Sequence, residues 1–349
     1  MSNLIIRLTL VMAATDSYSA SAYYECEKTA RGTSLTGFYA KLTRESLLQL
    51  TGPDASTFLQ GQVTCDVRNL SASSGMPGVY CSVQGRVICD FLLCQLEPDH
   101  LLLRMRRDIL PASLEALSKY SVFSKVKLHS DPEDFTVLGC WGEGCAQILR
   151  DIIGTLPEKP FETVAEEGFV IVRTPTAGDV FECYLDIRAN SVTSELQRRF
   201  TPASESEWHV QQVQNGVARI EASTSGEFVP QVLNYDLSSH ISFTKGCYTG
   251  QEVVARLHYR GKPKRRLYYA ELTDQLSMDD SLIEVGTPLF SAGSSRAVGN
   301  LINTAEASSG RHCMLITATE QGAAEGLHLN TQQGQKLTLA SPPLAVELQ

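Results

Sequence analysis

One short stretch of the chain combines a thiol with glycines, a cation and helix-start residues. It reads Lys245, Gly246, Cys247, Tyr248, Thr249, Gly250, Gln251 and Glu252. The spacing of Thr249 and Glu252 is that of a capping box, which predicts a helix beginning near Gly250. Cys247 would then lie just ahead of a helix N-terminus, where unpaired N–H groups and the helix dipole favour a thiolate.

Neighbouring residues strengthen this expectation for Cys247. Lys245 is two residues away and Arg256 could fold back, and nearby cations lower a cysteine pKa. Gly246 and Gly250 allow close backbone approach or positive φ. The sequence therefore predicts a reactive, partly exposed thiol. The alternative is a small buried hydrophobe in a glycine-rich turn.

The elements around this stretch indicate an α+β protein. Short turns join apolar runs between residues 79 and 103, so these strands should be antiparallel, and a helix follows over 109–120. Residues 131–201 mix strands and helices without strict βαβ alternation. After residue 266, short β-rich runs separated by Gly, Ser and Asp are typical of a small β-barrel. Ser204 and Glu207 form another capping box, which predicts a helix ending at Asn215-Gly216.

Composition narrows the class of protein. The chain has 349 residues and a net charge of −9, which argues against broad nucleic-acid binding. Its ten cysteines are scattered without a C-x-x-C pair, so we expect mostly buried, reduced thiols in a cytoplasmic protein and no zinc site. Residues 1–34 are expected to be a poorly ordered extension; export remains the alternative, because an apolar run precedes a small-residue segment, and the run is too short and polar to span a membrane.

The stretch 245–252 resembles the signature of the YgfZ family of folate-binding proteins, which lies within the glycine-cleavage T-protein (aminomethyltransferase) superfamily. Further similar blocks are Thr51–Asp54, Phe58–Thr64, Lys119–Val126, Gly226–Gln231 and Arg260–Arg266, so the likeness spans about residues 44–340. It implies a three-domain ring with a folate in its centre. A folate-binding domain would comprise 35–128 plus 204–265, a second α+β domain 129–203, and a C-terminal β-barrel 266–349.

The resemblance also implies ligand contacts. Trp208 matches a family tryptophan that lies against the folate, and an indole can stack on a pterin; a core anchor is the alternative. Glu221 is a candidate acceptor for pterin N–H groups, with a salt bridge to Arg219 or another cation as the alternative. Glu45 stands where some relatives carry a second aromatic. Residues 101–107 lack the polar pattern of the transferring T-proteins, so methylene transfer is not implied.

The resemblance implies an accessory protein that binds tetrahydrofolate or a related reduced folate. It would support assembly or repair of iron–sulfur enzymes, including radical enzymes that thiolate tRNA, with Cys247 as the functional thiol, tuned by Lys245, and a transient metal contact at most. The partners would be iron–sulfur client or assembly proteins, with neither membrane nor direct nucleic-acid contact. The alternatives are a folate-dependent one-carbon transferase and a folate-sensing regulatory module.

The sequence does not decide the role of one basic segment. Residues 245–266 hold seven Lys or Arg against one acid, Glu252. They could meet the polyglutamate tail of a folate, a partner protein or RNA phosphate, or form a solvated surface. Net acidity and the lack of interleaved base-stacking aromatics argue against direct RNA binding.

Overall fold

A computed structural model describes residues 36–131, 134–188, 190–272, 283–307 and 310–340. The predicted N-terminal extension and Cys26 lie outside these ranges. The described residues form one compact unit by their contacts. Within the described residues no helix is long and apolar enough to cross a membrane.

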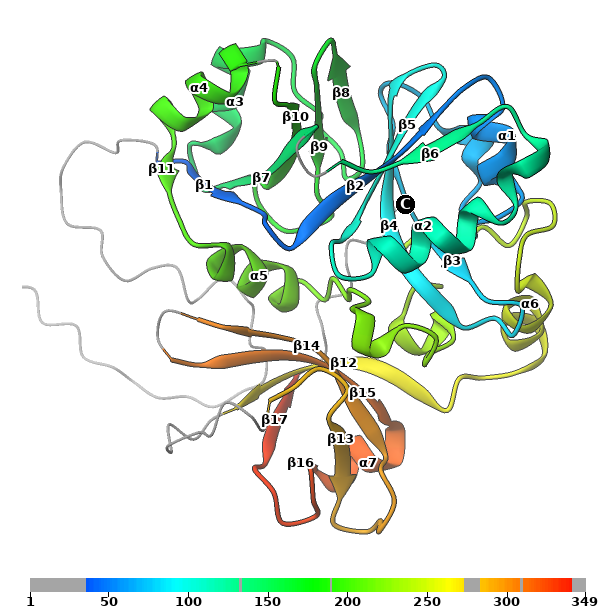
Figure 1. The fold of residues 1–349 in the computed structure, drawn as a ribbon. Coiled ribbons are helices and arrows are strands. Elements are labelled where there is room, and N and C mark those ends of the chain that lie inside the picture. Colours follow the sequence, from blue (N-terminus) through cyan, green and yellow to red (C-terminus); the bar gives the residue numbers. More distant parts are fainter. Residues whose placement is uncertain (1–35, 132–133, 189, 273–282, 308–309, 341–349) are drawn as a thin grey trace, which may run out of the picture. The chain divides into compact units, whose positions relative to one another are not determined.

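The first sheet is the antiparallel meander that the sequence predicts. Its strand order is β3-β4-β5-β2-β6, and the turn at Gln84-Gly85 joins β3 to β4. Two helices, α1 and α2, accompany it (Figure 1). The bounds are β2 Glu45–Thr51, α1 Ala55–Gln60, β3 Met76–Cys81, β4 Val87–Glu97, β5 His100–Arg106, α2 Leu110–Ser118 and β6 Lys127–His129, with 3-10 turns η2 at Val67–Asn69 and η3 at Ser121–Phe123.

The second sheet has six strands in the order β11-β1-β7-β10-β9-β8, and β1 joins it although the sequence placed residues 35–44 with the first domain. Helices α3 and α4 pack on one of its faces. The bounds are β1 Phe38–Lys41, β7 Phe135–Trp141, α3 Cys145–Ile153, β8 Thr163–Glu166, β9 Phe169–Arg173, β10 Phe181–Asp186, α4 Asn190–Arg199 and β11 Thr201–Pro202.

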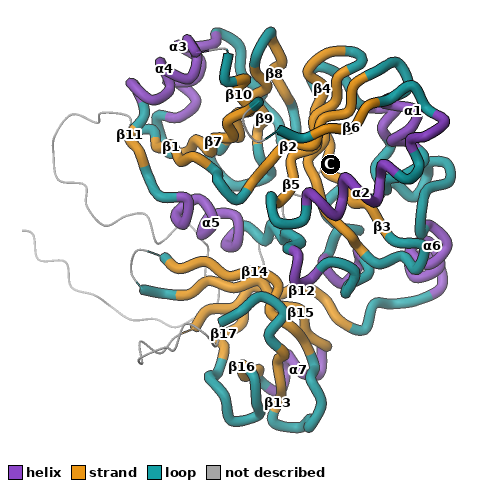
Figure 2. Tube along the Cα trace, in the orientation of Figure 1, coloured by secondary structure: helices purple, strands orange, loops and turns teal. Residues whose placement is uncertain are grey.

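The third sheet has the order β16-β13-β14-β15-β12-β17. A bridge between His328 and Lys336 brings its two ends together, so it nearly closes into the barrel that the sequence predicts. Figure 2 shows the three sheets in orange, with helices and loops between them. The bounds are β12 Arg265–Leu272, β13 Pro288–Ser291, β14 Gly299–Glu306, β15 His312–Thr319, α7 Glu320–Glu325, β16 Leu327–Leu329 and β17 Leu337–Ala340.

The two faces of the first sheet pack against two different cores. Leu92 and Leu102 point to a core shared with the second sheet, whereas Leu93, Leu101 and Leu103 face a core shared with α1, α2 and the third sheet. Burial on both faces explains the continuous apolar run in β5, because period-two alternation disappears when neither face meets water. The α+β class is thus confirmed.

The segment between the second and third sheets carries most of the predicted site residues. The predicted capping box is confirmed, because Ser204 and Glu207 cap α5 reciprocally. Helix α5 packs against β14 and β15 (Figure 1). The bounds are α5 Glu205–Gln214, η4 Ala222–Thr224, η5 Pro230–Leu233 and α6 Gln251–Arg260.

Candidate functional site

Lys245 fastens the signature loop to the end of α1. Its ammonium is almost fully buried and donates to the carbonyl oxygens of Gln60, Val63 and Cys65 at 2.8, 2.6 and 2.7 Å. The nitrogen also lies 5.3 Å from the ring centre of Tyr248. Burial lowers the pKa of Lys245 to about 8. The Lys245 ammonium, which the sequence places two residues from Cys247, thus donates its hydrogen bonds to carbonyl oxygens of the 60–65 loop.

Cys247 is exposed, in contrast to the other cysteines that the structure describes. Those eight thiols are buried, and burial raises the pKa of Cys65 and of Cys89 to about 12. Such thiols are poor nucleophiles at neutral pH. Within the described part of the chain, Cys247 is therefore the thiol that solvent reaches, and it lies four residues before the first residue of α6.

The helix begins near Gly250 as predicted, but its cap differs from the prediction. Gly250, with φ +83°, is the N-cap residue of α6, and no side chain caps the helix. The capping box predicted for Thr249 and Glu252 is therefore wrong, and the Thr249 hydroxyl donates instead to Gln62 Oε1 at 3.4 Å. A Cβ at position 250 would lie 2.4 Å from the Ser82 carbonyl oxygen, so the close approach to the β3–β4 hairpin requires glycine.

The other signature residues complete the loop. Tyr248 is buried, and the Gln251 side chain donates to the carbonyl of Gly246 at 3.4 Å. Gly246 has open space around it, since a Cβ there would meet nothing within 4 Å. Glu252 lies exposed in the first turn of α6. The loop is therefore anchored at Lys245, Tyr248 and Gly250 and leaves residues 246 and 247 at the surface.

A second cluster, the buried charge network, joins the first two sheets to the 219–221 segment and was missed by sequence reasoning. Arg104 of β5 forms a bidentate pair with Glu182 of β10 at 2.8 and 2.9 Å. Arg219 binds Asp90 at 2.6 Å and Glu45 at 3.0 Å. These partners are 78, 129 and 174 residues apart, so no local spacing could have indicated the cluster.

Glu45 is the centre of this network. It lies 3.3 Å from Arg106 and 3.6 Å from Arg104, besides its bond to Arg219. Burial by itself raises the pKa of Glu45, but the guanidinium groups of Arg219, Arg104 and Arg106 outweigh burial and lower it to about 2. Burial and the charge of Arg106 lower the pKa of His209 to about 4. Glu45 is therefore an ionised carboxylate held by three cations.

Glu221 belongs to this network, whereas Trp208 lies in the hydrophobic core shared by the first two sheets. The Trp208 ring is 2% exposed and lies 5.8 Å from the Trp141 ring. Glu221 accepts from Arg106 at 2.7 Å and from the Asn303 amide at 3.4 Å, whereas Arg219 has other partners. The salt bridge that was the alternative for Glu221 is present, with Arg106 as its cation.

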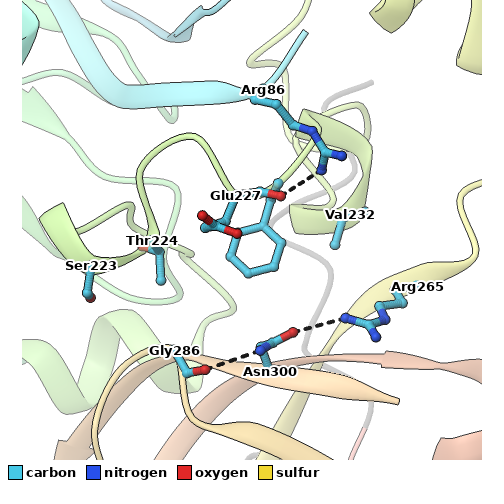
Figure 3. Close-up of a pocket in the computed structure, with 9 residues that line it drawn as sticks. Arg86, Ser223, Thr224, Glu227, Val232, Arg265, Gly286 and Asn300 are labelled. Atoms are coloured by element: carbon cyan, nitrogen blue, oxygen red, sulfur yellow. Dashed lines mark hydrogen bonds between the residues drawn. The ribbon is translucent and has the colours of Figure 1, made fainter. Parts of the chain in front are cut away.

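A cavity of about 330 Å³ lies between the 223–232 segment and strands β12 and β14. Figure 3 shows Arg86 and Arg265 reaching toward it from different elements. None of the site residues predicted from the sequence lines it; the lining residues are Arg86, Ser223, Thr224, Glu227, Phe228, Val232, Arg265, Gly286 and Asn300. Within the described residues, no group of three or more His, Cys, Asp or Glu side chains could hold a metal ion.

Comparison with solved structures identifies the fold of this chain. No family model matches the chain. The crystal structure of glycine cleavage system aminomethyltransferase T from Bartonella henselae matches with a TM-score of 0.70, covering 90% of this chain and 87% of that one at 17% identity. This protein therefore has the fold of the glycine-cleavage aminomethyltransferase.

Comparison with related sequences identifies the protein family to which this chain belongs. The chain is 32% identical to tRNA-modifying protein YgfZ of Colwellia psychrerythraea over 70% of its own length and 75% of the relative. It is also 32% identical to tRNA-modifying protein YgfZ of Klebsiella pneumoniae over 64% of its own length and 68% of that protein. The chain belongs to the YgfZ family.

Proposed function

We propose that this protein binds tetrahydrofolate or a related reduced folate and supports the assembly or repair of iron–sulfur enzymes, including tRNA-thiolating radical enzymes. Cys247 is its functional thiol, and it acts in the cytoplasm on client or assembly proteins, without contacting nucleic acid directly. The observation that carries the proposal is the exposure of Cys247 on an anchored loop, while the other cysteines in the described ranges are buried. A thiol held at the surface is available to a partner protein.

One orphaned polar atom supports the folate part of the proposal. The amide nitrogen of Gln212 is buried without a hydrogen-bond partner in the structure. Gln212 is one turn from Trp208 on α5, so the two side chains share a helix face. A pterin offers acceptors as well as donors, so it could satisfy this amide beside an indole and the carboxylate of Glu221. These residues fit a folate.

The role of Lys245 in this proposal is positional as well as electrostatic. Lys245 lies two residues before Cys247, and its three hydrogen bonds to carbonyl oxygens hold this part of the chain against the 60–65 loop. Its positive charge remains near the loop at neutral pH, because the pKa of about 8 keeps most of the ammonium protonated. The chain thus presents Cys247 at a fixed place on the surface and supplies a cation close by.

Iron–sulfur enzyme activity in cells tests the thiol. Cys247→Ala and Cys247→Ser should lower that activity while leaving the protein folded, because an exposed side chain contributes little to stability. Gly246→Ala is the matched control, since a methyl group there meets open space. Equal enzyme activity in all three variants would remove Cys247 from the function.

Calorimetric titration with tetrahydrofolate tests the ligand contact. Trp208→Ala should weaken binding by more than tenfold, whereas Trp141→Phe should keep it. Tryptophan quenching alone is ambiguous, because the chain has two tryptophans and their rings are 5.8 Å apart. Unchanged affinity of a folded Trp208→Ala protein would remove Trp208 from the site.

A one-carbon transferase is the second candidate, favoured by the fold shared with aminomethyltransferase T. Purified protein given a methylene donor and tetrahydrofolate would then form methylene-tetrahydrofolate at a rate proportional to the protein concentration. Absence of turnover with intact folate binding would favour the accessory role. Partner capture with and without folate separates that role from a folate-sensing module.

A further inference from the structure

The cavity beside η4 contains two guanidinium groups that no described carboxylate neutralises. Arg86 donates to the backbone carbonyl of Glu227 at 2.6 Å. Arg265 donates to the side-chain oxygen of Asn300 at 2.9 Å and to the Ala297 carbonyl at 2.8 Å. All of these acceptors are neutral. Figure 3 shows Arg86 above the cavity and Arg265 beside Asn300, so the two cations approach it from separate elements.

The partial burial of Arg265 makes its lack of a carboxylate partner informative. Burial lowers the pKa of Arg265, and no neighbouring acid offsets this effect. By contrast, Arg104, Arg106 and Arg219 of the buried charge network each have an acidic partner within 3.5 Å. A partly buried cation without an anion is costly, and an anionic ligand would relieve that cost.

Glu227 adds one negative charge to the same lining. It is exposed, and its carboxylate lies near the cavity in Figure 3. None of the ion pairs found in the described residues involves it. The charged lining therefore consists of two cations and one anion, a set complemented by two carboxylates and one ammonium. That combination is carried by an acidic amino acid.

The volume and the remaining lining agree with a ligand of this size. A cavity of about 330 Å³ lies at the lower end of the range for small-molecule sites. Phe228 and Val232 supply apolar surface for a short aliphatic chain, and Ser223 adds an exposed hydroxyl. The cavity suits a compact molecule with charged ends.

We propose that this cavity binds glutamate, either free or as the terminal residue of a larger molecule such as the folate itself. Arg86 and Arg265 bind the two carboxylates, and Glu227 accepts from the nitrogen. Only the second source rests on the proposed function. Free glutamate would make the cavity an independent amino-acid site.

Calorimetry on the full chain tests the site with L-glutamate and with glutarate, which has two carboxylates and no ammonium. Arg86→Gln should weaken both ligands by about tenfold or more, the usual effect of losing a charge-assisted hydrogen bond. Glu227→Gln should weaken glutamate but leave glutarate bound as before or more tightly. Arg150→Gln, which changes an exposed arginine on α3, should alter neither.

The conjugate source is tested with tetrahydrofolate and tetrahydropteroate, which lacks the glutamyl residue. If that source applies, tetrahydrofolate binds more tightly and Arg86→Gln abolishes the difference. The proposal is overturned if free glutamate does not bind and the two pterins bind equally, or if folded Arg86→Gln protein binds every ligand like the wild type. Tight tetrahydropteroate binding in that case would leave the folate proposal standing, whereas no binding of either pterin would refute that proposal separately.

Discussion

Replacing Lys245 with Met should destabilise the protein by about 3 kcal/mol and loosen the Cys247 loop. The ammonium makes three hydrogen bonds to carbonyl oxygens, and bonds from a charged donor contribute about 1.5–3 kcal/mol each. Their sum is reduced because methionine avoids the cost of burying a charge. The drop in pKa from 10.5 to about 8 corresponds to about 3 kcal/mol of that cost.

Urea denaturation at pH 7 measures the change, and Lys262→Met is the matched control. Lys262 is exposed, so its substitution should stay within about 0.5 kcal/mol of the wild type. Cys247 should also react more slowly with a disulfide reagent in Lys245→Met protein, because the variant lacks the cation close to the thiol. The rate is measured in a Cys26→Ser background, so that every remaining cysteine lies in the described residues. A Lys245→Met protein as stable as the wild type would refute the anchoring role of the three carbonyls.

Three further substitutions probe the site. Gly250→Ala should lower the free energy of unfolding in denaturant by about 3 kcal/mol, because φ is +83° and the methyl group would lie 2.4 Å from the Ser82 carbonyl oxygen. Gly246→Ala should be neutral, and equal stabilities of the two variants would contradict this reasoning. Glu45→Ala should cost about 3–5 kcal/mol by leaving buried guanidinium groups unpaired, and a loss under 1 kcal/mol would argue against the network. His209 has an ordinary pKa of 6.5 and a folded pKa of about 4, so the unfolded chain binds more protons than the folded chain between these pH values. The stability should therefore fall by about 3 kcal/mol as the pH drops from 6.5 to 4. Thermal unfolding of His209→Gln protein should show a weaker dependence of stability on pH over this range.

Local sequence signals predicted those features that local physics determines. The α5 capping box and the turn at Gln84-Gly85 depend on residues within four positions of each other, and both are confirmed. The capping box at Thr249 failed because a tertiary contact decided the cap. Ser82 approaches Gly250 so closely that glycine must occupy the N-cap position, and this contact is not visible from residues 249–252.

The site could be predicted only in part for the same reason. The motif indicated Cys247, and the structure places this thiol at the surface. The ligand contacts assigned to Trp208 and Glu221 stay predictions. Glu45 was noticed as a departure from an aromatic, but its role depends on Arg219, 174 residues away. Long-range charge pairing has no periodicity, so one sequence alone does not reveal it.

The β3–β4 hairpin connects the cavity to the Cys247 loop. The Val87 amide donates to the Phe228 carbonyl, and the Gly226 amide donates to the Val87 carbonyl, both at 2.8 Å. Two residues away, Gly85 approaches Gly250 so closely that a Cβ on Gly250 would lie 3.0 Å from its Cα. Arg86, which lines the cavity, lies between these contacts.

A ligand that binds Arg86 would therefore stiffen the hairpin on which the signature loop rests. Saturating L-glutamate should slow the reaction of Cys247 with a disulfide reagent about twofold or more, because ordering one packed element restricts its neighbour. Glutamate should have no such effect on Arg86→Gln protein, and Arg150→Gln should respond like the wild type. If glutamate binds while the thiol reacts at an unchanged rate, the hairpin does not couple the two sites.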